Sequence, residues 1–453
     1  MVVTESYLKK QLMGWVRDYF LQFASSEERV GIEVETIGVR SAGEAIAYHG
    51  DNGIAHVLEA LSRSYGWTPI MEDAHLIGLH RDKAEIHLEP GGQIEYCSTP
   101  QQNLCLLKRE IKMHYQELLS VNPGIHWLEL GYHPYARIQD ISWVPKKRYA
   151  IMREYLPKRA TLPYQMMKKT ASIQANFDYA NIEDAFVMLR LALALSPIVA
   201  ACFHNSPFSQ GKDTGILGMR SRAWMHTDPE RCGLVRAWIE APDLEHYVDY
   251  ILHMPLMFIV RSGKWIPAFG KRCLDFLREG LGSDQAEVSD MKYFLNTIFT
   301  EARLKPFVEI RCLDRNPLDV CFAFIALWKG LLYDPLARDQ AWGLVRDWDH
   351  QTRLKVYRDT PIHALNTPVG DGRMIRDYAK DIVQLSEEGL RRLKHRDKKC
   401  LSEKTNEEIA LLDPLKRIVF ETGLCPAEEQ IKSWHGVWNQ NMTKLIRHNS
   451  ITV

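Results

Sequence analysis

The sequence lacks an excess of charge of either sign. Its 453 residues hold 57 Lys and Arg and 57 Asp and Glu, so the formal net charge is zero. Nucleic-acid-binding domains are usually basic, so we expect no nucleic acid partner. No uninterrupted apolar run approaches eighteen residues, so we expect no association with a membrane. With 46% hydrophobic and 25% charged residues, the composition is that of an ordinary globular protein with a large core.

Paired cysteines and a leader segment are also missing. None of the nine cysteines falls in a C-x-x-C pair, which argues against a zinc site, and the odd count argues against a full disulfide framework. Residues 1–20 contain neither the apolar block of a signal peptide nor the Ser- and Arg-rich composition of a transit peptide. We therefore expect reduced thiols and a cytoplasmic location.

The common nucleotide-binding and hydrolytic motifs are absent as well. The stretch "SQGKDTG" (209–215) lacks the spacing of a phosphate-binding loop, and "GLGS" (280–283) is no dinucleotide fingerprint. Neither H-E-x-x-H nor G-x-S-x-G occurs. Any nucleotide must therefore bind here without a P-loop.

The chain is rich, by contrast, in segments where polar and apolar residues alternate. Alternation predicts strands at 29–39, 85–89, 93–97, 126–134, 168–179 and 305–314. Helical spacing predicts helices at 5–24, 52–65, 101–120, 184–205 and 318–333, and a charged helical segment from about residue 373. The order lacks the regular rhythm of a parallel doubly wound sheet. We therefore predict an α+β fold, built on an antiparallel sheet with one polar face.

The polar faces of these strands carry an unusual number of carboxylates. Side chains two apart on a strand share a face, so Glu33 lies beside Glu35, and Glu309 lies beside Arg311. Any one such face can be an ordinary solvated face. Several together predict a counter-charge, because neighbouring carboxylates repel each other. Mg²⁺ prefers oxygen ligands, and arginine binds phosphate through its planar fork, so the pattern indicates phosphoryl transfer.

Residues around these strands have structural explanations too. Gly91 and Gly92 either form a turn with unusual backbone angles or let the backbone approach a nucleotide. Surface positions are expected for Glu85, His87, Lys146, Lys147, Arg222, His226 and Arg231, and packing positions for Trp143 and Tyr149.

Longer stretches resemble a known family. They include "LEPGGQIEYCSTP" (88–100), "WVPKKRYAIMREYLPKRATLPYQMMKKTASIQANFDY" (143–179), "GMRSRAWMHTDPERCGL" (218–234), "NTIFTEARLKPFVEIR" (296–311) and "TGLCPAEEQIKSWHGVWNQ" (422–440). In these stretches the sequence resembles glutamate–cysteine ligase of the plant and proteobacterial type. The resemblance implies a glutamine synthetase-like fold, in which a curved antiparallel sheet forms a funnel surrounded by helices. It also implies one catalytic domain over residues 1–453.

The resemblance implies an activity as well. The family uses ATP and Mg²⁺ to join the γ-carboxylate of glutamate to the amine of cysteine through a γ-glutamyl phosphate, the first step of glutathione synthesis. The expected partners are these small molecules, and the expected state is a monomer or homodimer. Two alternatives stay open at this point: a related ligase with a different amine acceptor, and a catalytically inactive regulatory relative.

The same resemblance implies roles for individual residues. The metal ligands would be Glu33, Glu35, Glu89, Glu95 and Glu309. Gln174 and Asn176 would lie near the nucleotide, and Arg311 would contact phosphate and act with Glu309 in catalysis. Glutamate or phosphate would be bound by Arg220, Arg153 and Lys169.

Overall fold

A single large antiparallel sheet forms the centre of the molecule. The computed structural model describes residues 4–396 and 404–452, and nine strands within these ranges form this sheet. Eight strands follow the order β14-β15-β7-β1-β5-β4-β3-β2, and β6 pairs with the far end of β1. The strands are β1 (Val30–Val39), β2 (Thr68–Glu72), β3 (His75–Arg81), β4 (Ala84–Leu88), β5 (Ile94–Cys97), β6 (His126–Leu128), β7 (Ser172–Phe177), β14 (Ala302–Leu304) and β15 (Val308–Asp314).

Three two-stranded units lie outside the large sheet. Two are antiparallel hairpins and the third is a parallel pair. They are β8 (Phe208–Ser209) with β9 (Lys212–Asp213), β11 (Phe258–Arg261) with β12 (Lys264–Pro267), and β10 (Cys232–Gly233) with β13 (Phe299–Thr300).

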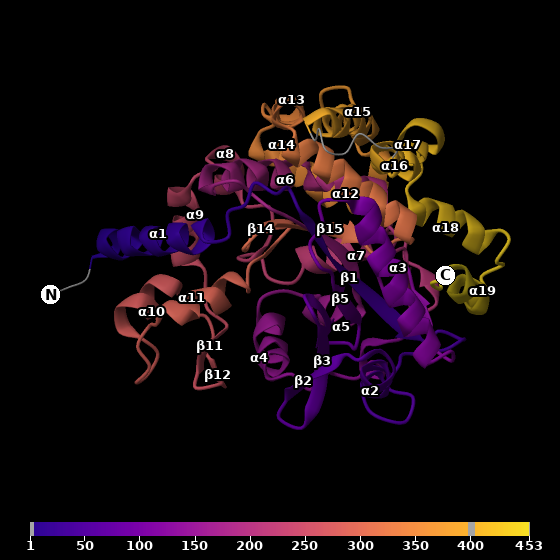
Figure 1. The fold of residues 1–453 in the computed structure, drawn as a ribbon, viewed down its shortest axis with the longest axis horizontal. Helices are drawn as coiled ribbons and strands as arrows, with labels where there is room; N and C mark the ends of the chain where they lie inside the picture. Colours follow the sequence, from indigo (N-terminus) through magenta and orange to yellow (C-terminus); the bar gives the residue numbers. More distant parts are fainter. Residues whose placement is uncertain (1–3, 397–403, 453) are drawn as a thin grey trace.

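Helices surround the sheet (Figure 1). Helix α6 packs on β14 and β15, α12 packs beside it on β7, and α15 forms an outer layer on α12. The helices of the first half are α1 (Glu5–Leu21), α2 (Ile54–Tyr65), α3 (Leu104–Val121), α4 (Lys147–Tyr155), α5 (Pro163–Lys169), α6 (Ile182–Phe203), α7 (Met219–Met225), α8 (Arg236–Glu240) and α9 (Leu244–His253). Those of the second half are α10 (Cys273–Glu279), α11 (Val288–Leu295), α12 (Leu318–Tyr333), α13 (Pro335–Val345), α14 (His350–His363), α15 (Ile375–Arg396), α16 (Lys404–Ala410), α17 (Asp413–Lys416), α18 (Pro426–His435) and α19 (Met442–His448).

Strand β1 lies in the middle of the sheet and is buried along its whole length. Ile32 and Val34 join the hydrophobic core, while Glu33 and Glu35 alternate with them and face the other way. The strand pairs with β5 on one side and β7 on the other, which places Glu35 opposite Glu95 and Glu33 opposite Gln174. The predicted polar faces therefore meet on neighbouring strands, and the α+β prediction is confirmed.

Two strands are shorter than predicted. Residues 168 and 169 were expected to begin a strand, but they form the end of helix α5. This helix forms because Pro163, in its first turn, already has a helical φ. The strand from 126 ends at Leu128. In both places polar and apolar residues keep alternating beyond the paired residues of the strand. Alternation shows which side of a segment is buried, and it does not show where the partner strand ends.

Helix α6 is apolar enough to have the composition of a membrane span. Among the described helices, α6 passes that test by length and composition, and α12 with α13 passes only as a pair bent by 99°. Within α6, 89% of the apolar window is buried inside the protein. Because Arg190 interrupts it, the helix reaches this composition without an uninterrupted apolar run of eighteen residues. Here α6 is the central helix of the core.

The C-terminal segment returns to the sheet. Trp434 of α18 and Leu445 and Ile446 of α19 form a small core cluster with Ile37 of β1 and Leu128 of β6. In the described parts of the chain, eight cysteines are free thiols; Cys400 lies outside them.

Candidate active site

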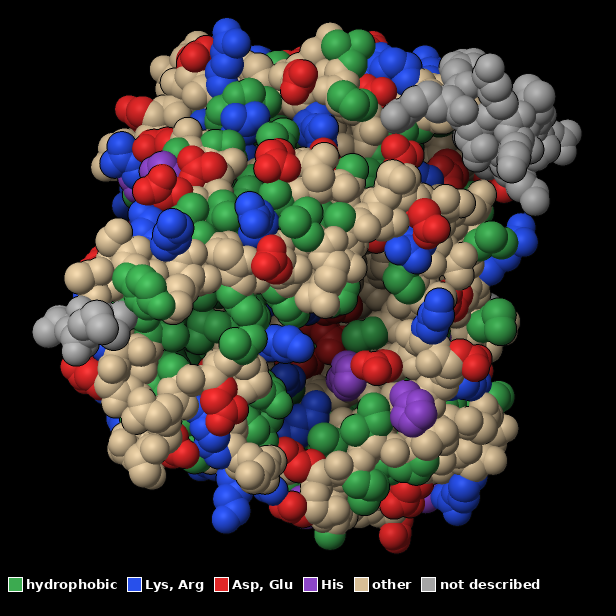
Figure 2. Space-filling model, turned by 60° about the vertical axis from the view of Figure 1, so that its left-hand side comes forward, with side chains coloured by type: hydrophobic (Ala, Val, Ile, Leu, Met, Phe, Trp, Pro, Cys, Tyr) green, Lys and Arg blue, Asp and Glu red, His purple; other side chains and the backbone are tan. Residues whose placement is uncertain are grey.

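A cavity of about 700 Å³ opens over the polar face of the sheet. Strands β1, β4, β5 and β7 form one wall, and the β11–β12 hairpin with the segment 293–307 forms the other. The face of the molecule drawn in Figure 2 is hollowed, and acidic, basic and hydrophobic side chains meet at the hollow. The large sheet therefore supplies the base of a deep, mixed-charge cavity.

Four of the five predicted metal ligands line this cavity: Glu33, Glu35, Glu89 and Glu95. The first two come from β1 and Glu95 comes from β5, directly opposite Glu35 in the register. Glu89 follows β4 in the turn that joins β4 to β5. Carboxylates far apart in the sequence are thus collected by strand pairing.

Amide groups hold these carboxylates in place. Glu35 accepts hydrogen bonds from the backbone N–H of Ser172 (2.6 Å) and from Nε2 of Gln174 (3.3 Å). The same Nε2 donates to Glu95 (3.3 Å), and Asn176 donates to Glu33 (3.1 Å). The predicted nucleotide-proximal residues Gln174 and Asn176 therefore contact the carboxylates directly.

The electrostatics of Glu35 and Glu95 are unfavourable to their ionised forms. Burial, together with the charge of Glu89, raises the pKa of Glu35 to about 7. Burial, followed by repulsion from Glu89, also raises the pKa of Glu95 well above its usual range. Glu35 and Glu95 are each only 9% exposed to solvent. The guanidinium groups of Arg220 and Arg311 lower the pKa of Glu35 but do not offset burial and repulsion, so positive charge is short here.

Glu309 lies in a different electrostatic environment. It is fully buried outside the cavity lining, and its oxygens accept from Arg303, from Lys305 (2.7 Å) and from Arg311 (2.9 Å). Burial alone would raise the pKa of Glu309, but these three cations hold it well below its ordinary value. The prediction that Glu309 binds metal stays a prediction; here the carboxylate anchors Arg311.

The carboxylates around Glu35 fit a hard cation in chemistry but are not arranged as a closed ligand set. Within residues 4–396 and 404–452, no three Asp, Glu, His or Cys side chains converge as ligands of one ion. The carboxylate oxygens are nevertheless the ligand type that Mg²⁺ prefers. A cation bound between them would reverse the repulsion that raises the pKa.

Cationic side chains line the cavity near Glu89. Arg148 lies 4.0 Å from a Glu89 oxygen, and its side chain is 43% exposed to the cavity. Nζ of Lys146 donates to the carbonyl of Leu88 (2.8 Å), and burial lowers its pKa to about 8. The expectation that Lys146 is a solvated surface residue was wrong, because its aliphatic stem is covered and only the amine reaches a polar partner.

Arg220 lies behind the cavity and holds Arg311, which lines it. Arg220 is buried, and its Nη2 donates to the carbonyl of Arg311 (2.7 Å). Its Nη1 lies 3.9 Å from Asp314, which also accepts from Ser206 (2.6 Å). Arg311 itself lines the cavity and donates to Gln174. The pair therefore forms a rigid positive layer under the carboxylates.

The two other predicted substrate contacts lie elsewhere. Arg153 is exposed, and its guanidinium lies 5.2 Å from the ring centre of Trp143. Lys169 is buried, and its Nζ donates to the hydroxyl of Ser209 (3.0 Å). Neither residue lines the cavity, so their roles stay predictions without support from this geometry.

An aromatic wall faces the carboxylates and was not predicted. Phe258, Trp265 and Tyr293 form a chain of edge-to-face contacts, with ring centres 4.8 and 5.7 Å apart, and all three line the cavity. Phe307 and Trp224 line it as well. The only signal in the sequence was the density of aromatic residues between 258 and 307, which does not distinguish a site from a core.

The two glycines of the β4–β5 turn have structural roles. Gly92 has φ 87°, which a residue with a side chain rarely adopts. A Cβ on Gly91 would lie 2.4 Å from the carbonyl oxygen of Lys168. Gly92 thus allows the backbone of the turn that carries Glu89, and Gly91 lets that turn pack tightly against the end of α5.

Comparison with known sequences gives a consistent result. The sequence profile of the family described as "Glutamate-cysteine ligase family 2" matches residues 29–448. A chloroplastic glutamate–cysteine ligase of Nicotiana tabacum is 33% identical over 450 residues, covering 97% of this chain and 82% of the relative. Chloroplastic glutamate–cysteine ligase B of Oryza sativa is 34% identical over 452 residues, covering 97% and 86%.

Solved structures share the fold at low sequence identity. A glutamate–cysteine ligase of Francisella tularensis, solved with AMP, has a TM-score of 0.56 at 12% identity and covers 94% of this chain and 88% of its own. A bifunctional glutathione synthetase of Pasteurella multocida has a TM-score of 0.53 at 10% identity, and the match covers 97% of this chain and 54% of that one. These matches support the predicted glutamine synthetase-like fold.

The relatives also overturn one expectation and settle the family. They are chloroplastic proteins, so the predicted cytoplasmic location is wrong. The prediction relied on leader composition, which is read by import receptors and leaves no trace in the folded part of a protein. The family match over 29–448 and the long relatives agree with the resemblance predicted from the sequence. The chain belongs to glutamate–cysteine ligase family 2.

Proposed function

We propose that this ligase uses ATP and Mg²⁺ to join the γ-carboxylate of glutamate to the amine of cysteine, as the first step of glutathione synthesis. The observation that carries the proposal is one cavity in which buried, unneutralised carboxylates face cationic and aromatic side chains. Family membership supports the same reaction. A carboxylate is a poor acylating agent at neutral pH, so it must first become a γ-glutamyl phosphate.

Glu33, Glu35, Glu89 and Glu95 would hold Mg²⁺, which offsets the repulsion between a substrate carboxylate and the γ-phosphate of ATP. Gln174 fixes two of these ligands, because its amide donates to both Glu35 and Glu95. The guanidinium of Arg311 donates to the side-chain carbonyl oxygen of Gln174, and this bond holds the amide in the donating orientation. The ligand positions are thus set by neutral groups that add no competing charge.

Arg311 would stabilise the negative charge on the phosphoryl group as it transfers from ATP to the substrate carboxylate. Its position is fixed by Glu309 and Gln174, and Arg220 is bonded to its backbone carbonyl. Because Arg311 is already placed, it needs no reorganisation at the moment of transfer. Glu309 would act here as a positioning residue.

The α-carboxylate of glutamate needs a cation on the cavity surface. Arg148 is in this position, since its guanidinium lines the cavity, donates to the hydroxyl of Tyr149 (3.0 Å) and lies 4.0 Å from Glu89. We therefore add Arg148 to the predicted substrate-binding residues.

The amine of cysteine then attacks the acyl carbon, loses a proton, and phosphate departs. The aromatic wall of Phe258, Trp265 and Tyr293 suits the flat base of the nucleotide.

We propose further that the chain works as one catalytic domain, including the segment from about residue 373. Helix α15 packs on α12, and α19 packs on β6, so this segment contacts both the outer layer and the sheet. Limited proteolysis tests this: one core of nearly full length is expected. A stable fragment ending near residue 373 would contradict it.

An ADP-release assay with ATP, Mg²⁺ and glutamate tests the reaction itself. Release that requires cysteine is expected, with γ-glutamylcysteine as product. Release with another amino acid but not with cysteine would contradict the proposal and favour the related ligase. No release with any amine, from folded protein that binds ATP, would contradict it in favour of an inactive relative.

A further inference from the structure

A second pocket, of about 760 Å³, lies across helix α7 from the active-site cavity. Met219, Arg222 and His226 line this pocket, whereas Trp224 lines the cavity. Residues three and four apart share a helix face, so 219, 222 and 226 project from one side and 220 and 224 from the other. One short helix thus separates two distinct hollows.

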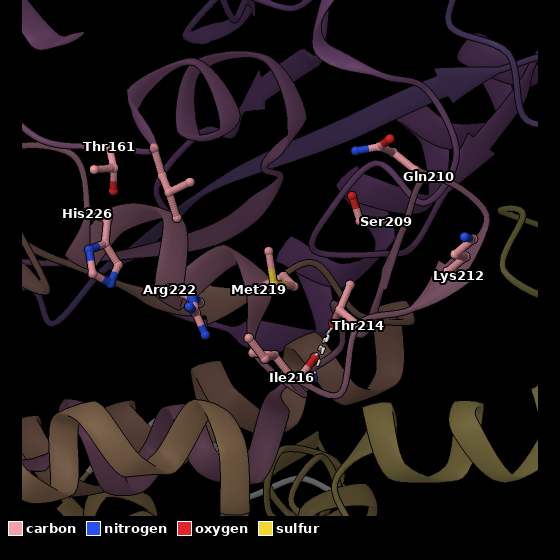
Figure 3. A pocket seen from close by; sticks show the side chains of 10 residues that line it. Thr161, Ser209, Gln210, Lys212, Thr214, Ile216, Met219, Arg222 and His226 are labelled. Carbon is pink, nitrogen blue, oxygen red and sulfur yellow. Dashed lines mark hydrogen bonds between the residues drawn. The ribbon is translucent and has the colours of Figure 1, made fainter.

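The other walls come from two loops. Figure 3 shows Ser209, Gln210 and Lys212 on one side of the pocket, Thr161 and His226 on the other, and Met219 between them. The first group belongs to the β8–β9 hairpin, whose two central residues both have positive φ, 52° for Gln210 and 75° for Gly211. This is the two-residue turn typical of a tight hairpin.

Hydrogen bonds fix these walls in position. The backbone N–H of Leu162 donates to the carbonyl of His226 (2.8 Å), which ties the Thr161 loop to α7. Lys169 donates to Ser209 (3.0 Å), and the backbone N–H groups of Leu217 and Gly218 donate to the carbonyl of Pro361 (2.8 and 3.0 Å). The pocket is therefore formed without a ligand.

The pocket carries basic groups without acids. Lys212, Arg222 and His226 line it, and no acidic side chain does. Across the described chain, none of these three side chains takes part in an ion pair or a side-chain hydrogen bond. Asp213, the acid next to Lys212, is bonded instead to His435 (3.1 Å) and to the N–H of Gly215 (2.9 Å).

We propose that this pocket binds a small organic anion with carboxylate or phosphate groups beside an apolar body. Arg222 and Lys212 supply positive charge and hydrogen-bond donors, and Arg binds both groups through its planar fork. The hydroxyl of Thr161 adds a neutral donor. Leu162, Ile216 and Met219 line the remaining surface, and the volume lies in the range of small-molecule sites.

Hydrogen–deuterium exchange of the full chain tests the site, with inorganic phosphate and citrate as separate probes in buffer without divalent cations. Each reports one source of negative charge. Protection of residues 209–216, none of which lines the active-site cavity, reports occupancy of this pocket. We expect at least one probe to protect this segment. The doubly substituted variant Lys212→Gln, Arg222→Gln should need at least tenfold more probe for half-protection.

The matched control is Lys112→Gln with Arg358→Gln, which removes two exposed cations outside the pocket. It should keep the half-protection concentration of the original protein. Because all four positions are exposed, both variants should unfold at the original temperature. Protection by phosphate alone, by citrate alone or by both would support the site and name its ligand class. Absence of protection with either probe, or unchanged protection in the double variant, would overturn the proposal.

Discussion

Two groups of buried carboxylates on one sheet have opposite charge balance. Glu309 on β15 accepts hydrogen bonds from three cationic side chains, and its pKa lies well below the ordinary value. Glu35 on β1 and Glu95 on β5 accept only from amide groups, and burial raises the pKa of both. The protein supplies the positive charge that neutralises Glu309, but it leaves the charges of Glu35 and Glu95 without a cationic hydrogen-bond partner.

The difference shows that burial of an acid does not by itself identify a metal ligand. Burying a charge is costly unless it is paired. Glu309 meets this requirement within the protein, and so it has a structural role. Glu35 and Glu95 do not meet it, and the proposed function assigns the missing positive charge to a cation that arrives with the substrates. The most informative experiments compare substitutions in the two groups.

The largest effect on stability is expected for Glu309→Gln. Removing this charge leaves Arg303 and Arg311 buried without their carboxylate partner, and we expect the free energy of unfolding to fall by roughly 3–5 kcal/mol. Urea denaturation measures this change. The exposed pair of Arg236 with Glu240 is the control, and Glu240→Gln should cost less than about 1 kcal/mol. A similar, small loss for both variants would contradict the comparison.

Glu35→Gln should show the reverse pattern. We expect kcat/KM for ADP release to fall by about 10²–10³-fold, because a ligand for the charge-stabilising ion is lost. The free energy of unfolding without Mg²⁺ should stay the same or rise, since a buried and repelled charge is removed. Exposed Glu59 on α2 is the control, and Glu59→Gln should leave both quantities unchanged. A large loss of stability in Glu35→Gln would show that its charge is already neutralised.

Stability should also depend on pH through Glu35. Its folded pKa of about 7 exceeds the ordinary 4.5, so the folded state binds the proton more tightly and is favoured at low pH. Without divalent cations, the unfolding free energy of the original protein, relative to Glu35→Gln, should fall by about 3 kcal/mol between pH 4.5 and 7. Denaturation at half-unit pH steps measures it. A flat difference would contradict the raised pKa.

The strands that carry the site could be predicted because their signal is local. Ile32 and Val34 alternate with Glu33 and Glu35, and this alternation depends only on which side of the strand is buried. The pairing of Glu35 with Glu95 could not be derived in the same way, since register depends on contacts sixty residues apart in the chain. The family resemblance, and not the pattern, linked these acids to one site.

Other site residues escaped prediction for physical reasons. Lys146 is buried against the usual preference of lysine, because the carbonyl of Leu88 accepts from its amine. Trp265 and Tyr293 resemble core residues in the sequence, and only the positions of the β11–β12 hairpin and of α11 bring them to the cavity.

The effect of Mg²⁺ on stability at pH 8 tests the central claim most directly. Above the raised pKa, Glu35 is ionised and repelled, so an ion that binds only the folded state should stabilise it. At a concentration about 100 times its dissociation constant, Mg²⁺ should add about 2.7 kcal/mol to the unfolding free energy. The double variant Glu35→Gln, Glu95→Gln should lose this gain, while Glu59→Gln keeps it. No gain in the original protein, or an equal gain in the double variant, would contradict the account.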